Sequence, residues 1–218
     1  MKRLLVICEG ETEQAFSAKT LRPFFEEKSI YLHAPLIKAS AGGIVKWAVL
    51  KEQIERHLKE DKNVYLTTLI DYYGISAKHL FPQWAEAQSI SNKSSRLDFL
   101  EQSMQADINL PLRNRFFPYL QLHEFEALLF SNIEVMKSQI PPQDLVGIKE
   151  LETTNSDYPN PEMINDNQAT TPSHRLKRII RGYNKIVHGD IISDVIGLSR
   201  IREKCPRFNS WITKLENI

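Results

Sequence analysis

The start of the chain constrains its fold more than any other segment. A continuous apolar run at residues 4–8 has the length and pattern of a strand that is buried on both faces of a parallel sheet. The turn after it reads Glu9-Gly10-Glu11-Thr12-Glu13. Gly10 permits a sharp turn, and Thr12 can cap a helix that begins there. The sequence therefore predicts a carboxylate at the carboxyl end of a buried strand, where open α/β sheets bind their ligands.

Strand-like and helix-like patterns alternate through the next sixty residues. The helical ranges are 12–27, where Pro23 can end or kink the helix, and 44–60. The strand ranges are 31–39 and 64–70, and Pro35 in the first of them favours an edge position; residues 40–43 read as a turn. The order βαβαβ predicts an α/β fold, with a mostly parallel, Rossmann-like sheet flanked by helices. Right-handed crossovers would bring the ends of the first and third strands to one edge of the sheet.

The remainder of the chain is mostly helical in pattern. We expect a helix at 95–108, a strand at 116–122, and at 153–172 a polar connector or insert that is not part of the core. From residue 173 to 218 the pattern is helical, and its apolar residues, Ile191 and Val195 among them, can pack inward. These features predict an α/β domain over residues 1–130 and a helical C-terminal extension over 131–218, together forming one compact unit.

Charge is balanced overall but not locally. The net charge is +1, so the field of the whole molecule does not indicate a partner. Residues 134–166 contain seven acids and two basic residues, whereas residues 172–207 contain nine basic residues and three acids. The basic residues that could bind a nucleic-acid backbone are Arg175, Lys177, Arg178, Arg181 and Lys185. Alternatively, this segment is a solvated helix face, or it docks against the acidic segment.

Cysteine usage and hydropathy favour the cytoplasm. Cys8 and Cys205 are too few for a disulfide framework. We expect no signal peptide, since only five apolar residues precede Glu9, and no membrane span.

Two acids stand out as candidate metal ligands. Glu9 and Asp71 are each the first acid after a buried strand, so their carboxylates should converge if the strands are neighbours. Hard oxygen ligands suit Mg²⁺ or Mn²⁺, and Glu13 lies one helical turn beyond Glu9. Three acids within five residues also resist burial unless a cation joins them. The alternative is a capped, solvated start of a helix.

These residues resemble the Toprim domain, which topoisomerases, primases and nucleases of the overcoming-lysogenisation-defect type share. More narrowly, three stretches resemble an uncharacterised bacterial Toprim-like family of unknown function. They are 9–13, 123–130, and the tail containing 172–185, His188-Gly189 and 205–208.

The resemblance implies a divalent metal that supports phosphodiester chemistry, with Glu9, Asp71 and Glu13 as catalytic and metal-binding residues. Tyr73 stands where the family has a second aspartate, and Glu124 or Glu126 could complete the ligand set. The alternative for these two acids is that they favour the dipole at the start of a helix.

The activity implied is that of a Mg²⁺- or Mn²⁺-dependent nuclease acting on DNA or RNA, with a role in bacterial defence against phage. The chain has no Gly-x-x-x-x-Gly-Lys phosphate loop. An alternative is therefore a catalytically weak Toprim-like regulatory or binding subunit that works with a separate ATPase. A third hypothesis makes Asp71 a phosphoacceptor, but it requires a lysine after a later strand that the sequence does not place.

Overall fold

The computed structural model describes residues 2–38, 43–165 and 167–218, and it divides the chain into two compact units. The first unit comprises Met1–Leu122 and Lys214–Ile218, and the second comprises His123–Thr213. The two units divide at residue 122, and the last five residues belong to the first unit. The expectation of a boundary at 130 and of one compact unit stays a prediction.

A parallel sheet organises the first unit. Its strands are β1 (Lys2–Cys8), β2 (Ile30–His33), β3 (Val64–Asp71), β4 (Phe116–Phe117) and β5 (Leu120–Gln121). The order is β2-β1-β3-β4, β5 also pairs with β3, and every pairing is parallel. The predicted α/β fold is confirmed, as is the edge position of the strand that precedes Pro35.

One predicted strand, 116–122, is interrupted. Pro118 lies between β4 and β5 and has no N–H to donate to a ladder. The Thr68 hydroxyl, on β3, donates to Tyr119 O at 2.8 Å and accepts from Tyr119 N at 3.0 Å. This buried side chain therefore supplies hydrogen bonds that a regular ladder would have made.

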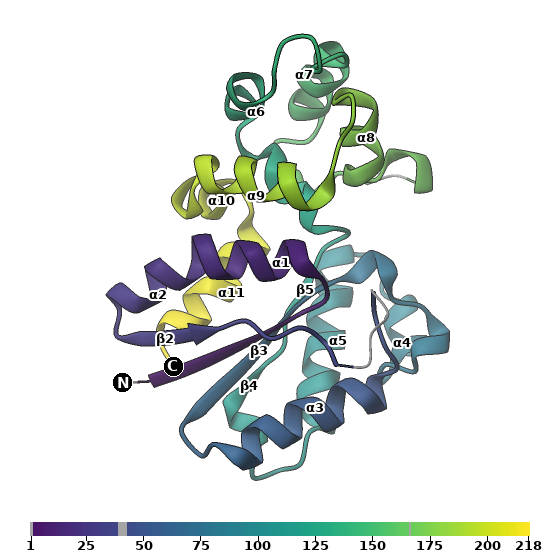
Figure 1. The fold of residues 1–218 in the computed structure, drawn as a ribbon. Helices are drawn as coiled ribbons and strands as arrows, with labels where there is room; N and C mark the ends of the chain where they lie inside the picture. The colour runs from purple at the N-terminus through teal and green to yellow at the C-terminus, as the bar shows by residue number, and fades with distance from the viewer. Residues whose placement is uncertain (1, 39–42, 166) are drawn as a thin grey trace. The chain divides into compact units, whose positions relative to one another are not determined.

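Helices cover both faces of the sheet (Figure 1). On one face lie α1 (Glu11–Phe16) and α2 (Arg22–Glu27), joined by a π-helical segment, Ser17–Leu21. The irregular segment lets the helix continue past Pro23, which cannot donate a backbone hydrogen bond. On the other face lie α3 (Trp47–Glu60) and α5 (Lys93–Asp107), with the short α4 (Trp84–Gln88) beside them. The core on this face includes Ile7, Ile54 and Leu100.

The second unit is helical, as predicted. Its helices are α6 (Ile133–Gln139), α7 (Ile148–Asp157), α8 (Pro172–Ile179), α9 (Lys185–Ile196), α10 (Leu198–Lys204) and α11 (Pro206–Glu216), the last of which continues into the first unit. None of the described helices is long and apolar enough to span a membrane.

Three local predictions need correction or fall outside the described residues. The stretch 153–172 is not a simple connector, because α7 extends into it and Glu162 and Ile164 are buried. Ile191 and Val195 do not pack inward; they are 44% and 49% exposed. The predicted turn at 40–43 lies largely outside the described residues, which exclude 39–42.

Candidate functional site

Glu9 and Asp71 lie together at the carboxyl edge of the sheet. Because β1 and β3 are adjacent and parallel, with Cys8 paired to Leu69, both acids lie at the same end of the two strands: Glu9 directly follows β1, and Asp71 is the last residue of β3. The Asp71 N–H donates to Glu9 Oε2 at 3.0 Å, and the Glu9 N–H donates to Leu69 O at 3.2 Å. Asp71 is 8% exposed. The structure thus brings these two sequence-predicted site residues together.

Gly74 adjoins the same carboxylate and was not singled out from the sequence. A Cβ placed on Gly74 would stand 3.5 Å from Glu9 Oε1, so the glycine leaves room beside that oxygen. The only signal in the sequence is a glycine three residues after Asp71. Tyr73, at the position of the family's second aspartate, is 40% exposed.

Glu13 holds the turn between β1 and α1. Its Oε2 accepts a hydrogen bond from the Gly10 N–H at 3.0 Å, and the residue is only 2% exposed. A Cβ on Gly10 would stand 3.1 Å from that oxygen, so the close approach favours glycine. Burial, reinforced by the charge of Glu13, raises the pKa of the Cys8 thiol, which makes Cys8 an inert core residue. Capping explains the position of Glu13 without a metal ion.

Glu9 and Asp71 are residues of the type that hard divalent cations prefer as ligands. Two carboxylates supply the oxygen ligands that Mg²⁺ and Mn²⁺ prefer, and Mg²⁺ commonly binds one or two carboxylates while it keeps several waters. In the part of the chain that the structure describes, no three His, Cys, Asp or Glu side chains form a group that could hold a metal ion. The site would therefore depend on Glu9 and Asp71 together with water or substrate oxygens.

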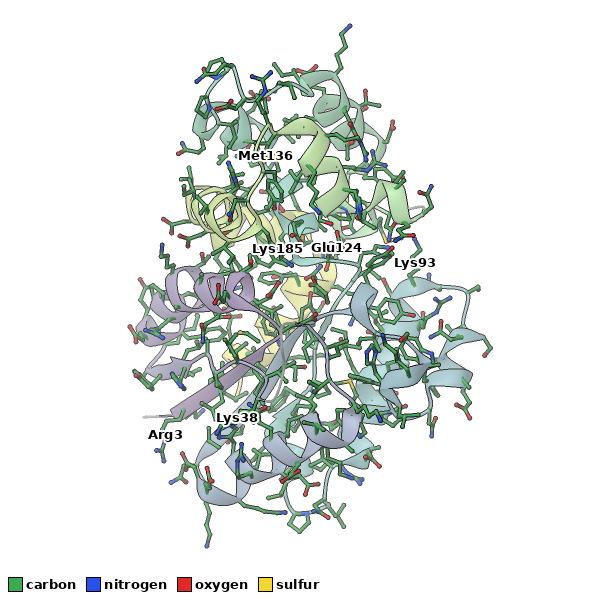
Figure 2. All side chains as sticks on the ribbon, turned by 45° about the vertical axis from the view of Figure 1, so that its right-hand side comes forward. Arg3, Lys38, Lys93, Glu124, Met136 and Lys185 are labelled. Carbon is green, nitrogen blue, oxygen red and sulfur yellow. The ribbon has the colours of Figure 1, made fainter. Side chains whose placement is uncertain are left out.

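Glu124 and Glu126 lie in the second unit, each beside a partner from its own unit. Glu124 accepts hydrogen bonds from Ser173 N at 2.8 Å and Ser173 Oγ at 3.0 Å, in the first turn of α8. Glu126 is 1% exposed, and its Oε1 lies 3.5 Å from Lys185 Nζ. Figure 2 labels both Glu124 and Lys185. The first contact matches the alternative in which an acid favours a helix start, although here the helix belongs to another segment.

The segment around these acids has a strained start. His123 is buried and has a φ of 67°, a left-handed conformation that is uncommon for residues other than glycine. Its Nδ1 lies 3.2 Å from Asn165 Nδ2. Instead of an α-helix, Phe125–Ser131 forms a 3₁₀ helix. The contacts of Glu124 with Ser173 and of Glu126 with Lys185 join two of the stretches that carry the family resemblance, 123–130 and 172–185.

Three of the predicted nucleic-acid-binding residues, Arg175, Arg178 and Lys185, have partners inside the second unit, and that of Lys185 is Glu126. Arg178 forms a forked pair with Glu150, its Nε lying 3.1 Å from each carboxylate oxygen, and that carboxylate raises the pKa of Arg178. Arg175 donates to Thr154 Oγ1 at 3.0 Å. Arg175 and Arg178 therefore contact residues of the acidic segment 134–166, as the alternative interpretation of the basic segment predicts. Lys177 and Arg181 are exposed.

Fold and site together define the class: an α/β protein with a parallel sheet and two acids at the carboxyl ends of its adjacent central strands. The chain belongs to the family described as Domain of unknown function (DUF4276), whose match covers residues 8–216. No curated protein and no solved structure matches it.

Proposed function

We propose that the chain is a Mg²⁺- or Mn²⁺-dependent enzyme that hydrolyses nucleic-acid phosphodiesters. One observation carries the proposal: Glu9 and Asp71 meet at the carboxyl edge of a parallel sheet, joined by the hydrogen bond from Asp71 N to Glu9 Oε2 at 3.0 Å. Acids in this position suit hard cations and phosphate chemistry. The Toprim resemblance of residues 9–13 and Asp71 supports the same reaction class.

The roles of the residues follow from their contacts. A bound divalent ion would stabilise charge on the phosphoryl oxygens and lower the pKa of a bound water. Glu9 and Asp71 hold the cation, and the Asp71 N–H fixes one oxygen of Glu9 before any ion arrives. Glu13 accepts a hydrogen bond from the Gly10 N–H and so positions the turn; we do not assign it as a ligand of the metal ion. Because Arg175, Arg178 and Lys185 have partners within the second unit, we propose Lys177 and Arg181 as the contacts to nucleic acid.

Metal-dependent cleavage by the purified protein tests this proposal. Labelled single-stranded DNA, double-stranded DNA and RNA are incubated with Mg²⁺, Mn²⁺ or EDTA. We expect cleavage only with metal, and a loss of about a hundredfold or more in Glu9→Gln and Asp71→Asn. Glu11→Gln is the matched control, since it removes an exposed acid from the same turn. Cleavage that survives both site substitutions would overturn the proposal.

The regulatory-subunit alternative predicts a different result. A catalytically weak subunit would cleave none of the three substrates in any metal, and Glu9→Gln would not alter that. Activity that depends on a separate ATPase would then be sought by adding the candidate partner. Loss of activity in Glu11→Gln equal to that in Glu9→Gln would indicate a general charge effect instead of a site.

A further inference from the structure

A basic cleft lies at the amino ends of the strands, whereas Glu9 and Asp71 lie at their carboxyl ends. It has a volume of about 530 Å³ and is lined by Lys2, Arg3, Lys62, Asn63, Tyr65 and Arg115. These residues come from the start of β1, the turn and first residues of β3, and the 3₁₀ helix that precedes β4. Figure 2 labels Arg3 at the start of β1. Since β1 has seven residues, a strand length of about 20 Å separates the two ends.

The cleft concentrates positive charge. Four of its six lining residues are basic, and the described residues that line it include no acid. Asp61, in the adjacent turn, pairs with Arg3 at 2.7 Å. Lys2 Nζ donates to Ile218 O, whereas in the described part of the chain no salt bridge joins Lys62 or Arg115 to a carboxylate. Positive charges in a cleft attract anions, and the low dielectric constant of the surrounding protein strengthens this attraction.

The guanidinium of Arg115, one of the residues that line this cleft, is fixed in position. Arg115 Nη1 donates to Asp61 O at 2.9 Å and to Val64 O at 3.0 Å, and its Nη2 donates to Leu58 O at 2.8 Å. Carbonyl groups orient the guanidinium but do not cancel its charge, and Leu58 O belongs to the last turn of α3, where a cation is favourable. By contrast, Lys62 is exposed and able to move toward a ligand.

We propose that this cleft binds a phosphate-bearing ligand. Ammonium and guanidinium groups are the side chains that recognise phosphate, and the volume is that of a small-molecule pocket. Tyr65 adds a half-buried aromatic ring, packed against Phe117 with centroids 6.2 Å apart, beside the cations. This combination suits a nucleotide, either free or as part of a nucleic acid, with its phosphates on Lys62 and Arg115 and its base beside Tyr65.

Binding in EDTA separates this site from the proposed metal site. The probes are inorganic pyrophosphate, ADP and a single-stranded oligonucleotide of about 12 nucleotides, each titrated at low salt. The wild type should bind, and Lys62→Glu should weaken the affinity about tenfold. Lys149→Glu, an exposed lysine of the second unit, makes the same charge change and should alter affinity less than about twofold.

The arms of the experiment also identify the source of the phosphate. Oligonucleotide affinity well above that of ADP, with a steep salt dependence, assigns the cleft to nucleic acid. ADP affinity equal to or above that of the oligonucleotide assigns it to a free nucleotide. The absence of binding by the wild type to all three probes would overturn the proposal, and so would equal weakening by Lys62→Glu and Lys149→Glu. Neither result bears on Glu9 and Asp71, because no metal is present.

Discussion

Single residues stabilise this fold through buried carboxylates that accept hydrogen bonds from backbone amides. Glu162, 1% exposed, accepts from Arg207 N at 2.8 Å and Phe208 N at 3.0 Å, at the start of α11. Glu101 accepts from Leu120 N at 2.9 Å, where the sheet is interrupted. Such charge-assisted bonds are stronger than neutral ones, and removing the acceptor leaves buried amides unsatisfied.

Replacing Glu162 with alanine should therefore destabilise the second unit. We expect the free energy of unfolding to fall by about 2–3 kcal/mol, because two amides at a helix N-terminus lose their acceptor. Urea titration followed by circular dichroism measures the change. Glu134→Ala removes an acid whose side chain is 73% exposed, and should cost less than about 1 kcal/mol. Equal losses in the two variants would contradict the capping role.

The sequence predicted the placement of Glu9 and Asp71 because an apolar run shows where a buried strand ends. It did not predict the role of Glu162, which lies in a polar stretch and looks solvated. Its partners are 45 and 46 residues away along the chain, and only the tertiary fold brings them to it.

Pairs of elements are held together by the same chemistry, as Glu55 on α3 shows. Its carboxylate accepts from Asn109 N at 3.1 Å and Asn109 Nδ2 at 2.6 Å, in the segment after α5. Burial alone would raise the pKa of Glu55, but the bonds from Asn109 and from Lys59 together lower it. An acid with a lowered pKa in the folded state stabilises the fold above its unfolded value, about 4.5. That stability is lost as the pH falls through the folded pKa.

Glu55→Gln should consequently flatten the acid side of the stability profile. At pH 7 we expect a loss of about 1–2 kcal/mol in the free energy of unfolding, since the acceptor loses its charge. As the pH falls below about 4.5 the difference from wild type should shrink. Urea titrations from pH 7 to about pH 3 measure both effects. Glu60→Gln, whose side chain is 64% exposed, is the control. A constant difference at every pH would contradict the assigned ionisation.

Elements with a clear pattern of apolar residues could be predicted from the sequence. Elements whose form depends on contacts with distant residues could not. The strand at 2–8 follows from a continuous apolar run, and the strand at 64–71 follows from a segment rich in β-branched and aromatic residues. The break at Pro118 is bridged by Thr68, a residue whose hydroxyl gives no sign in the sequence that it bonds Tyr119. In α9 apolar residues occur on more than one face, so the pattern could not tell that Ile191 and Val195 are exposed.

At the scale of the whole molecule, the chain consists of two units with different charge arrangements. In the second unit the forked pair of Arg178 with Glu150 joins α8 to α7. Several of the basic residues counted in the sequence between 172 and 207 therefore form contacts within the second unit. The count of charges along the chain could not show this, because it does not tell which acid faces which base.

The exposed basic residues give a test of nucleic-acid binding that leaves this pair intact. Lys177→Glu with Arg181→Glu should weaken binding of DNA or RNA and reduce its salt dependence, because fewer counterions are released. The free energy of unfolding should change by less than about 1 kcal/mol. Fluorescence anisotropy across a salt series measures the binding. Arg178→Ala is the comparison, and it should affect stability more than affinity. Equal salt slopes in wild type and the double variant would exclude these residues as contacts.

The most direct test of the account is a calorimetric titration of Mn²⁺ and Mg²⁺ into the wild type, Glu9→Gln, Asp71→Asn and Glu13→Gln. We predict that the wild type binds one ion and that the first two variants bind it at least about tenfold more weakly. Glu13→Gln keeps an oxygen for the Gly10 N–H and should change the affinity less than about threefold. No binding by the wild type at millimolar metal, or unchanged affinity in Glu9→Gln and Asp71→Asn, would contradict the central claim that these two carboxylates form a metal site.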